Sequence, residues 1–149
     1  MTLFYALQIR TLYLCLGMLL FVAHPAISAD YNSGVTSKVL AKTTLTGNGQ
    51  KISYPLTDKA EVTAMTVDLA PGAETGWHKH PVPVYAYVVS GSLAVELEGG
   101  NKLSFTAGDA IIEVVNTMHN GKNLADVPVK LAVFYLGAEG TPNVIRETK

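Results

Sequence analysis

Residues 71–91 read PGAETGWHKHPVPVYAYVVSG, and the fold prediction rests on this stretch. It carries His78 and His80, one residue apart, in a segment rich in Val and Tyr that is typical of a β-strand. Alternate side chains of a strand point to the same face, so we expect the two imidazoles to converge. Imidazole nitrogen is the commonest protein ligand for divalent transition metals, so the pair predicts half of a metal site. The third predicted ligand is His119, because it is the one other histidine outside the N-terminal segment.

Residues 1–29 have the pattern of a cleaved export signal. Arg10 precedes an apolar run over residues 12–23, which is shorter than a bilayer-spanning helix needs, and the small residue Ala29 ends the segment. We therefore expect an exported protein, periplasmic or secreted, that begins at Asp30 and has no membrane attachment after cleavage. The alternative interpretation is an uncleaved membrane anchor.

The composition narrows the chemistry of the mature domain, residues 30–149. The sole cysteine, Cys15, leaves with the signal, so the mature chain is predicted to have neither disulfides nor thiolate ligands. A formal net charge of −1 provides no basic patch, so nucleic acid is not an expected partner. The stability of an exported domain without disulfides must then come from its core, from a metal or from a partner subunit.

The remaining pattern is that of an all-β domain. Short apolar or alternating segments recur between Gly, Pro and Asn residues, and no window has a sustained helical stripe. Strands are expected over residues 35–45, 61–69, 85–89, 92–98, 102–105, 110–115 and 129–136. Residues 116–119 are predicted to form a corner, residues 120–123 a polar segment and residues 137–149 a tail. Many short strands at this spacing indicate a sandwich or a barrel in a single domain.

Two spaced motifs resemble those of the cupin superfamily. In the first, Gly72 stands six residues before His78, His80 follows, and Gly91 closes the motif. In the second, GDAIIEVVNTMHNGKN over residues 108–123, a glycine, a histidine and an asparagine have the family's spacing; they are Gly108, His119 and Asn123. Over residues 61–136 the chain resembles a small single-domain cupin of the quercetin-dioxygenase-like type.

This resemblance implies a double-stranded β-helix, which is a jelly-roll barrel, with a metal bound inside by His78, His80 and His119. It also implies a homodimer, since small jelly rolls often pair through their sheets. The metal is expected to be a divalent transition ion, one of zinc, iron, manganese, nickel or copper.

The chain departs from the family's pattern at the glutamate of the first motif. That position falls at Val84, or at Tyr85 with the longer spacing, and neither is a carboxylate. Val114 and Asn116 replace the proline and glycine of the second motif, and Asn also tolerates the positive φ of a turn. Two interpretations of the lost glutamate are open: a site of three neutral imidazoles, which we favour, or a weakened site in a vestigial cavity.

Two functions from different classes follow from these interpretations. The first is an exported metal-binding cupin that acts as a metal-dependent, dioxygenase-like enzyme on a small organic molecule. The second is a non-catalytic cupin that binds a small ligand or sequesters metal. Glu74 and Glu113 flank the motif histidines and are candidates for a base or for a group that orients an imidazole; a solvated strand-end position is our expectation for each. Asn123 is expected to stabilise a turn.

Overall fold

The structure is a computed structural model that describes residues 33–147. Residues 33–37 contain only a turn, and the compact unit begins at Lys38. Residues 38–147 form nine strands and no helix, and thus none of the described segments is a helix able to cross a bilayer. The strands are β1 (Ala60–Leu69), β2 (His78–Lys79), β3 (Val84–Ser90), β4 (Ser92–Leu97), β5 (Lys102–Thr106), β6 (Ala110–Ile112), β7 (His119–Lys122), β8 (Val129–Ala138) and β9 (Ile145–Arg146).

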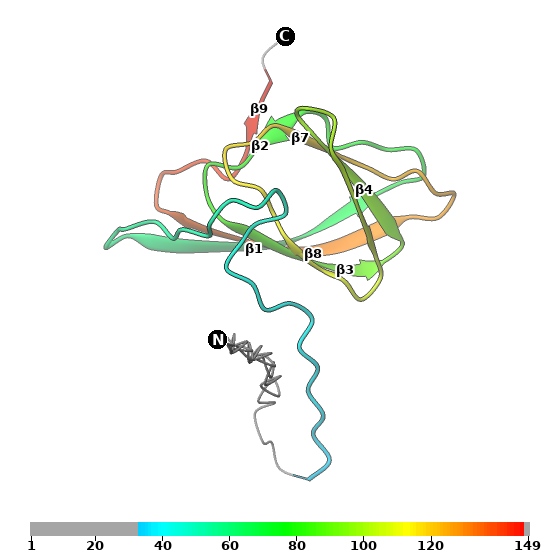
Figure 1. Ribbon diagram of the computed structural model, residues 1–149, viewed down its shortest axis with the longest axis horizontal. Coiled ribbons are helices and arrows are strands. Elements are labelled where there is room, and N and C mark those ends of the chain that lie inside the picture. The colour runs from blue at the N-terminus through cyan, green and yellow to red at the C-terminus, as the bar shows by residue number, and fades with distance from the viewer. Residues whose placement is uncertain (1–32, 148–149) are drawn as a thin grey trace, which may run out of the picture. The chain divides into compact units, whose positions relative to one another are not determined.

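Two antiparallel sheets face each other, as the all-β prediction required (Figure 1). One sheet has the strand order β1-β8-β3-β6, and the other has the order β5-β4-β7-β2-β9. Apart from β4 and β5, which form a hairpin, the strands that lie side by side are not consecutive in the sequence. This is the topology of a jelly roll rather than of a simple meander. The all-β jelly-roll prediction is confirmed.

The core lies between the sheets, where the alternating residues of each strand meet. In β4 the burial pattern alternates along Ser92–Leu97, and Leu93, Val95 and Leu97 are the buried residues. The opposite sheet contributes Val84, Val88 and Val129, whose side chains are fully buried. This apolar layer fixes the register of both sheets, because a slip of one residue would turn every inward side chain toward solvent.

The turn predictions agree with the backbone. Gly99 and Gly100 both have positive φ, at 88° and 89°, in the hairpin between β4 and β5. Asn116 has a φ of 54° and is the sole non-glycine residue among residues 33–147 with positive φ. Asn thus replaces the glycine of the second motif without removing the left-handed conformation that the turn requires.

The predicted strand over residues 35–45 is wrong. Only Leu45 pairs, in an isolated bridge to Lys51 across the turn at residues 46–50. The Val- and Thr-rich composition has the right propensity, but a strand also needs a partner and a face to bury. Val39 and Leu40 are exposed, and apart from the bridge at Leu45 the segment joins neither sheet.

The second half of the chain also differs from the prediction at two places. Residues 119–122, predicted as part of a corner and a polar segment, form β7, which lies between β4 and β2. The predicted tail contains β9, which pairs with β2. In both cases the partner strand is distant in the sequence, so the local pattern does not reveal the pairing.

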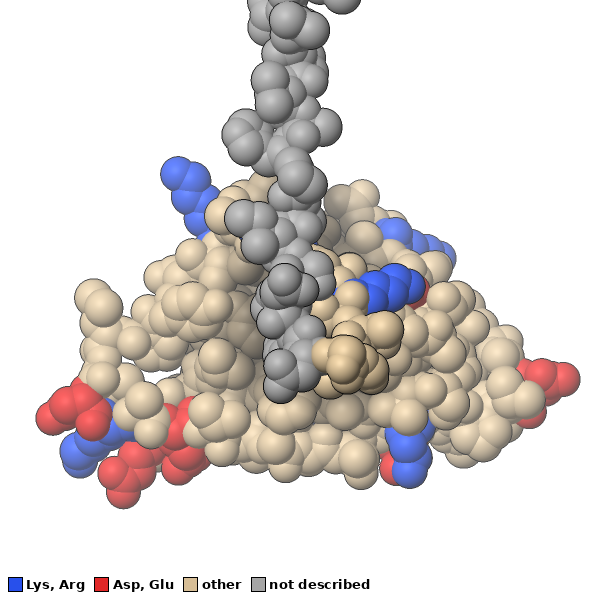
Figure 2. All heavy atoms as spheres, turned by 90° about the horizontal axis from the view of Figure 1, so that it is seen from below, with Lys and Arg blue, Asp and Glu red and all other residues tan. Residues whose placement is uncertain are grey.

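The outer face of the four-stranded sheet is apolar over its middle. Phe134 stands on this face between its register partners Ala64 and Tyr85, and Val62 stands beside Leu136. Val62 is 64% exposed and Phe134 is 45% exposed. Figure 2 views the molecule from below; most of the Lys, Arg, Asp and Glu side chains visible there lie toward the rim, and one blue side chain lies near the middle.

Candidate metal centre

The backbone brings the three predicted histidines together inside the barrel. His78 on β2 stands directly opposite His119 on β7. His80 lies two residues beyond His78, on the same side of the chain. The ring centroids of His78 and His119 are 4.3 Å apart, and His80 is 4.9 Å from each of them. The exposed fractions are 8% for His78 and 2% for the other two, so the cluster is shielded from solvent.

Each imidazole is held by a backbone carbonyl at its Nδ1 atom. The Nδ1 atom of His78 donates to the Gly76 carbonyl at 2.7 Å. That of His80 donates to the Asn143 carbonyl at 2.8 Å, and that of His119 to the Thr117 carbonyl at 2.9 Å. A carbonyl only accepts, so Nδ1 carries the proton and the Nε2 lone pair of each ring is left free. Potential ligand atoms of the three rings lie within 4.8 Å of one another.

The surroundings keep these rings neutral. Burial lowers the pKa of His80 to about 4, and the hydrogen bond to Asn143 offsets only part of that effect. Burial likewise lowers the pKa of His119 to about 4, and the neighbouring His78 adds to the shift. The pKa of His78 is also lowered, chiefly by burial. Neutral imidazoles with one oriented lone pair each are the form that a divalent transition metal requires.

Val84 stands where the motif's glutamate would stand. It is 1% exposed and points into the barrel, in register with Tyr135 of β8. Its side chain has no donor atom, so this position gives the cluster no ligand. Tyr85 has the opposite orientation, and its hydroxyl donates to the Tyr54 hydroxyl at 3.0 Å. The longer motif spacing therefore does not provide a ligand either.

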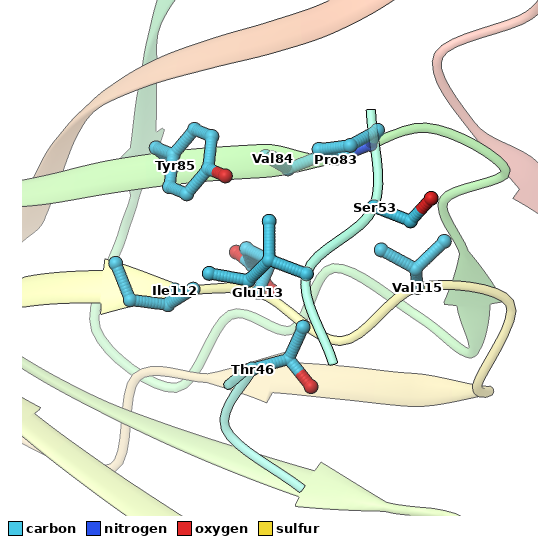
Figure 3. Close-up of a pocket in the computed structure, with 9 residues that line it drawn as sticks. Thr46, Ser53, Pro83, Val84, Tyr85, Ile112, Glu113 and Val115 are labelled. Carbon is cyan, nitrogen blue, oxygen red and sulfur yellow. The ribbon is translucent and has the colours of Figure 1, made fainter. Parts of the chain in front are cut away.

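Glu113 lies inside the barrel, which corrects the expectation of a solvated carboxylate. Its side chain is 13% exposed, and its Oε2 atom is 3.6 Å from Nε2 of His119. Burial raises the pKa of Glu113 to about 7. Without a metal, the raised pKa of Glu113 and the lowered pKa of His119 favour the neutral form of each side chain, so the contact is then between neutral groups. Figure 3 shows Glu113 between the strand that carries Val84 and the segment that carries Thr46.

Two small cavities, each of about 10 Å³, are both lined in part by Glu113. One lies beneath Pro83 and Val84, and the other lies in the apolar core beside Leu97 and Ile111. A volume of this size holds about one water molecule. Small reactants or solvent therefore have room next to the carboxylate.

Tyr135 is a residue of the site that the sequence interpretation missed. It is buried, and its ring centroid is 5.4 Å from that of His80. Burial raises the pKa of Tyr135, and the charge of Glu113 raises it further. The alternation in residues 129–136 predicts which side chains point inward. It does not reveal that Tyr135 pairs with Val84, because that depends on the β3–β8 register.

Glu74 lies away from the cluster, as expected for a solvated carboxylate. It accepts a hydrogen bond from Asn120 at 2.7 Å and lies 3.7 Å from the Lys122 ammonium. Asn120 and Lys122 alternate with His119 along β7, so they point to the opposite face of the sheet. The side chain of Glu74 is half exposed.

Asn123 has the turn-stabilising role that was expected. It is 0% exposed, and its Nδ2 donates to three carbonyls, those of Leu69, Ala70 and Val127. Its Oδ1 accepts from the backbone N–H of Ala125. These bonds join the end of β1 to the loop before β8.

Comparison with known proteins agrees with this architecture. The family model of the cupin domain matches residues 65–135, which include all three histidines and Glu113. The chain contains a cupin domain. No curated protein matches the chain.

Solved structures share the fold of this cupin domain. The DMSP lyase DddQ from Ruegeria pomeroyi is 20% identical with a TM-score of 0.50, over 57% of this chain and 42% of the lyase. The oxalate decarboxylase of Lactobacillus farciminis, in a formate complex, is 22% identical with a TM-score of 0.50, over 57% of this chain and 26% of the decarboxylase. The chain thus spans less than half of the length of either protein, and at these identities the likeness concerns the fold alone.

Proposed function

We propose that this cupin binds one divalent transition metal through the Nε2 atoms of His78, His80 and His119. The observation that carries the proposal is the hydrogen bonding of all three Nδ1 atoms to backbone carbonyls, which leaves three lone pairs in one buried cluster. The donor set suits zinc, iron, manganese, nickel or copper(II). The ion would supply Lewis-acid or redox chemistry at the centre of the barrel.

The proposed activity is that of a metal-dependent, dioxygenase-like enzyme acting on a small organic molecule. Three neutral ligands leave positions open for a reactant, and the carbonyls of Gly76, Asn143 and Thr117 keep the rings fixed. Tyr135 lies beside His80 in the same interior and is a group able to hold or move a proton there. The small cavities beside Glu113 admit water-sized reactants.

A non-catalytic metal-binding role is the second candidate. The low exposure of His80 and His119 favours it, because an organic substrate needs a path to the ion. A closed three-histidine site would sequester metal without turnover.

Two measurements test these proposals. Elemental analysis of protein purified without a histidine tag should find about one transition metal per chain; a metal-free protein that also fails to take up added metal would contradict the site. Nitric oxide, used as a dioxygen surrogate, should bind to the Fe(II)-loaded protein and give an electron paramagnetic resonance signal. If no such signal appears, the sequestering role is favoured over the enzyme.

We also propose that the protein is exported, on the basis of residues 1–29. That segment lies outside the described residues, so the proposal rests on its sequence alone. N-terminal sequencing of the exported protein should begin at or within a few residues of Asp30. An intact Met1 in the exported fraction would contradict it.

We further propose a homodimer that buries the apolar outer face of the four-stranded sheet. An exposed apolar face on a sheet is a typical interaction surface. The charges at the two ends of β1 and β8 are paired, Lys59 with Glu139 and Lys130 with Asp68, so an identical face meets no net charge. A dimer in solution that Phe134→Glu converts to a monomer would support this interface. The control is Leu124→Glu, an exposed leucine in the loop between β7 and β8; a monomeric wild type would contradict the proposal.

A further inference from the structure

Glu113 is the direct neighbour of Val84, the residue that stands where the first motif has its glutamate. Its backbone N–H donates to the carbonyl of Val84 at 3.0 Å, so the two residues are neighbours on adjacent segments of the same sheet. Ile111 is buried and Ile112 points outward, in register with Tyr85. The next residue, Glu113, therefore points inward, beside the Val84 side chain.

The carboxylate also lacks a cationic partner. Among residues 33–147 its one ion-pair contact is with Nε2 of His119. That nitrogen carries a lone pair and no proton, because the ring proton is on Nδ1, which donates to Thr117. A carboxylate buried without a counter-charge is costly, and such groups are usually paired or bound to a metal. A cation at the histidine cluster would provide the missing charge.

The contact distance fits a shared metal. With metal–nitrogen and metal–oxygen distances of about 2.0 to 2.2 Å, two ligands of a tetrahedral site stand about 3.4 Å apart. The observed separation of Glu113 Oε2 and His119 Nε2 is 3.6 Å. The carboxylate approaches the cluster from the His119 side, whereas a glutamate at Val84 would approach from β3.

We propose that Glu113 is the carboxylate ligand of the metal centre, in place of the glutamate that the first motif lacks at Val84. The inference rests on the three-histidine site proposed above. The barrel would thus keep a ligand set of three histidines and one glutamate, with the glutamate supplied by the neighbouring segment after β6.

The test compares Glu113→Gln with Glu74→Gln. Glu74 is a matched control because it is the same residue type near β7, on the opposite face of the sheet. We expect Glu113→Gln to weaken zinc affinity at least tenfold and to change the visible spectrum of the Co(II)-loaded protein, while Glu74→Gln changes neither. A Glu113→Gln protein with wild-type affinity, or with an unchanged Co(II) spectrum, would overturn the proposal.

A relocation experiment covers the case in which Glu113→Gln is poorly folded. The double variant Val84→Glu with Glu113→Val moves the carboxylate back to the motif position and conserves the residue composition of the site. We expect its zinc affinity to return to within a few-fold of the wild-type value, whereas Glu113→Val alone stays weak. Equal affinities for wild type and Glu113→Val would overturn the proposal. His119→Ala distinguishes a failure of the Glu113 proposal from a failure of the three-histidine site. If His119→Ala also keeps the wild-type zinc affinity, the three-histidine site itself is wrong.

Discussion

Glu113 donates its backbone N–H to the carbonyl of Val84 over 3.0 Å, which sets a buried carboxylate beside a buried valine. The valine stands where the family's motif has a carboxylate, and the carboxylate stands where the sequence alone suggested a solvated residue. Adjacent segments of one sheet bring their inward side chains close together, so either can present a carboxylate to the same interior. A motif compared residue by residue therefore misses a ligand that a neighbouring segment supplies.

The burial of Glu113 predicts a pH-dependent cost in the metal-free protein. Its folded-state pKa of about 7 lies above the usual value of 4.5, so the unfolded chain ionises first as the pH rises. The cost is absent below about pH 4.5 and complete above pH 7. Metal-free Glu113→Gln should therefore be more stable than wild type by about 1 to 3 kcal/mol at pH 8, with little difference at pH 4.5.

Urea unfolding of both chelator-treated proteins at the two pH values measures this difference. The shifted histidine pKa values affect both proteins alike, so the comparison isolates Glu113. An equal difference in unfolding free energy at pH 4.5 and pH 8 would show that the carboxylate is not buried as described.

Gly91, the last residue of the first motif, is required by a close backbone approach. Its φ is 81°, and an added Cβ would lie 2.6 Å from the Pro128 carbonyl oxygen and 2.9 Å from Val129 Cα. Both contacts are with backbone, which cannot rotate away. We expect Gly91→Ala to lower the free energy of unfolding by about 2 to 4 kcal/mol.

The matched control is Gly100→Ala, in the hairpin between β4 and β5. Gly100 has a similar φ of 89°, but no atom lies within 4 Å of its added Cβ. This variant should show only the cost of the left-handed conformation, about 1 kcal/mol. Equal losses for the two variants would mean that the contact with residues 128 and 129 has no effect.

Asn123 predicts a large loss on truncation. Its side-chain amide serves three carbonyls and one N–H in a fully buried position. Asn123→Ala leaves these groups without partners, so we expect a loss of about 2 to 4 kcal/mol in thermal or urea unfolding. Asn101→Ala, at an exposed turn position, should change the free energy by less than about 0.5 kcal/mol. A similarly small change for Asn123→Ala would contradict the bonding described.

The sequence predicts the parts of this protein that local patterns encode. The alternation in residues 92–98 and 129–136 predicts β4 and β8 with their inward faces, and the two spaced motifs predict the jelly roll and the three clustered histidines. Partner choice is not local, which explains the failures. Residues 35–45 have strand propensity but, apart from the bridge at Leu45, join neither sheet, while the polar residues 119–122 become a strand because β4 and β2 flank them.

Non-local strand pairing also explains why the sequence did not identify Glu113 and Tyr135 as residues of the site. Glu113 and Tyr135 become inward neighbours of Val84 only through the pairing of distant segments. No spacing rule within either segment indicates that contact. The histidines, by contrast, are separated by intervals that the motifs themselves define.

A zinc titration of metal-free wild type and His119→Ala, with circular dichroism as the check on folding, tests the central claim most directly. His119 stands opposite His78, and its Nδ1 is already bonded to the Thr117 carbonyl, so its Nε2 is free for the ion. The wild type should bind one zinc ion per chain, and His119→Ala should lose most of that binding while keeping the β-sheet spectrum. A folded His119→Ala that binds one zinc ion with wild-type affinity would contradict the three-histidine metal centre.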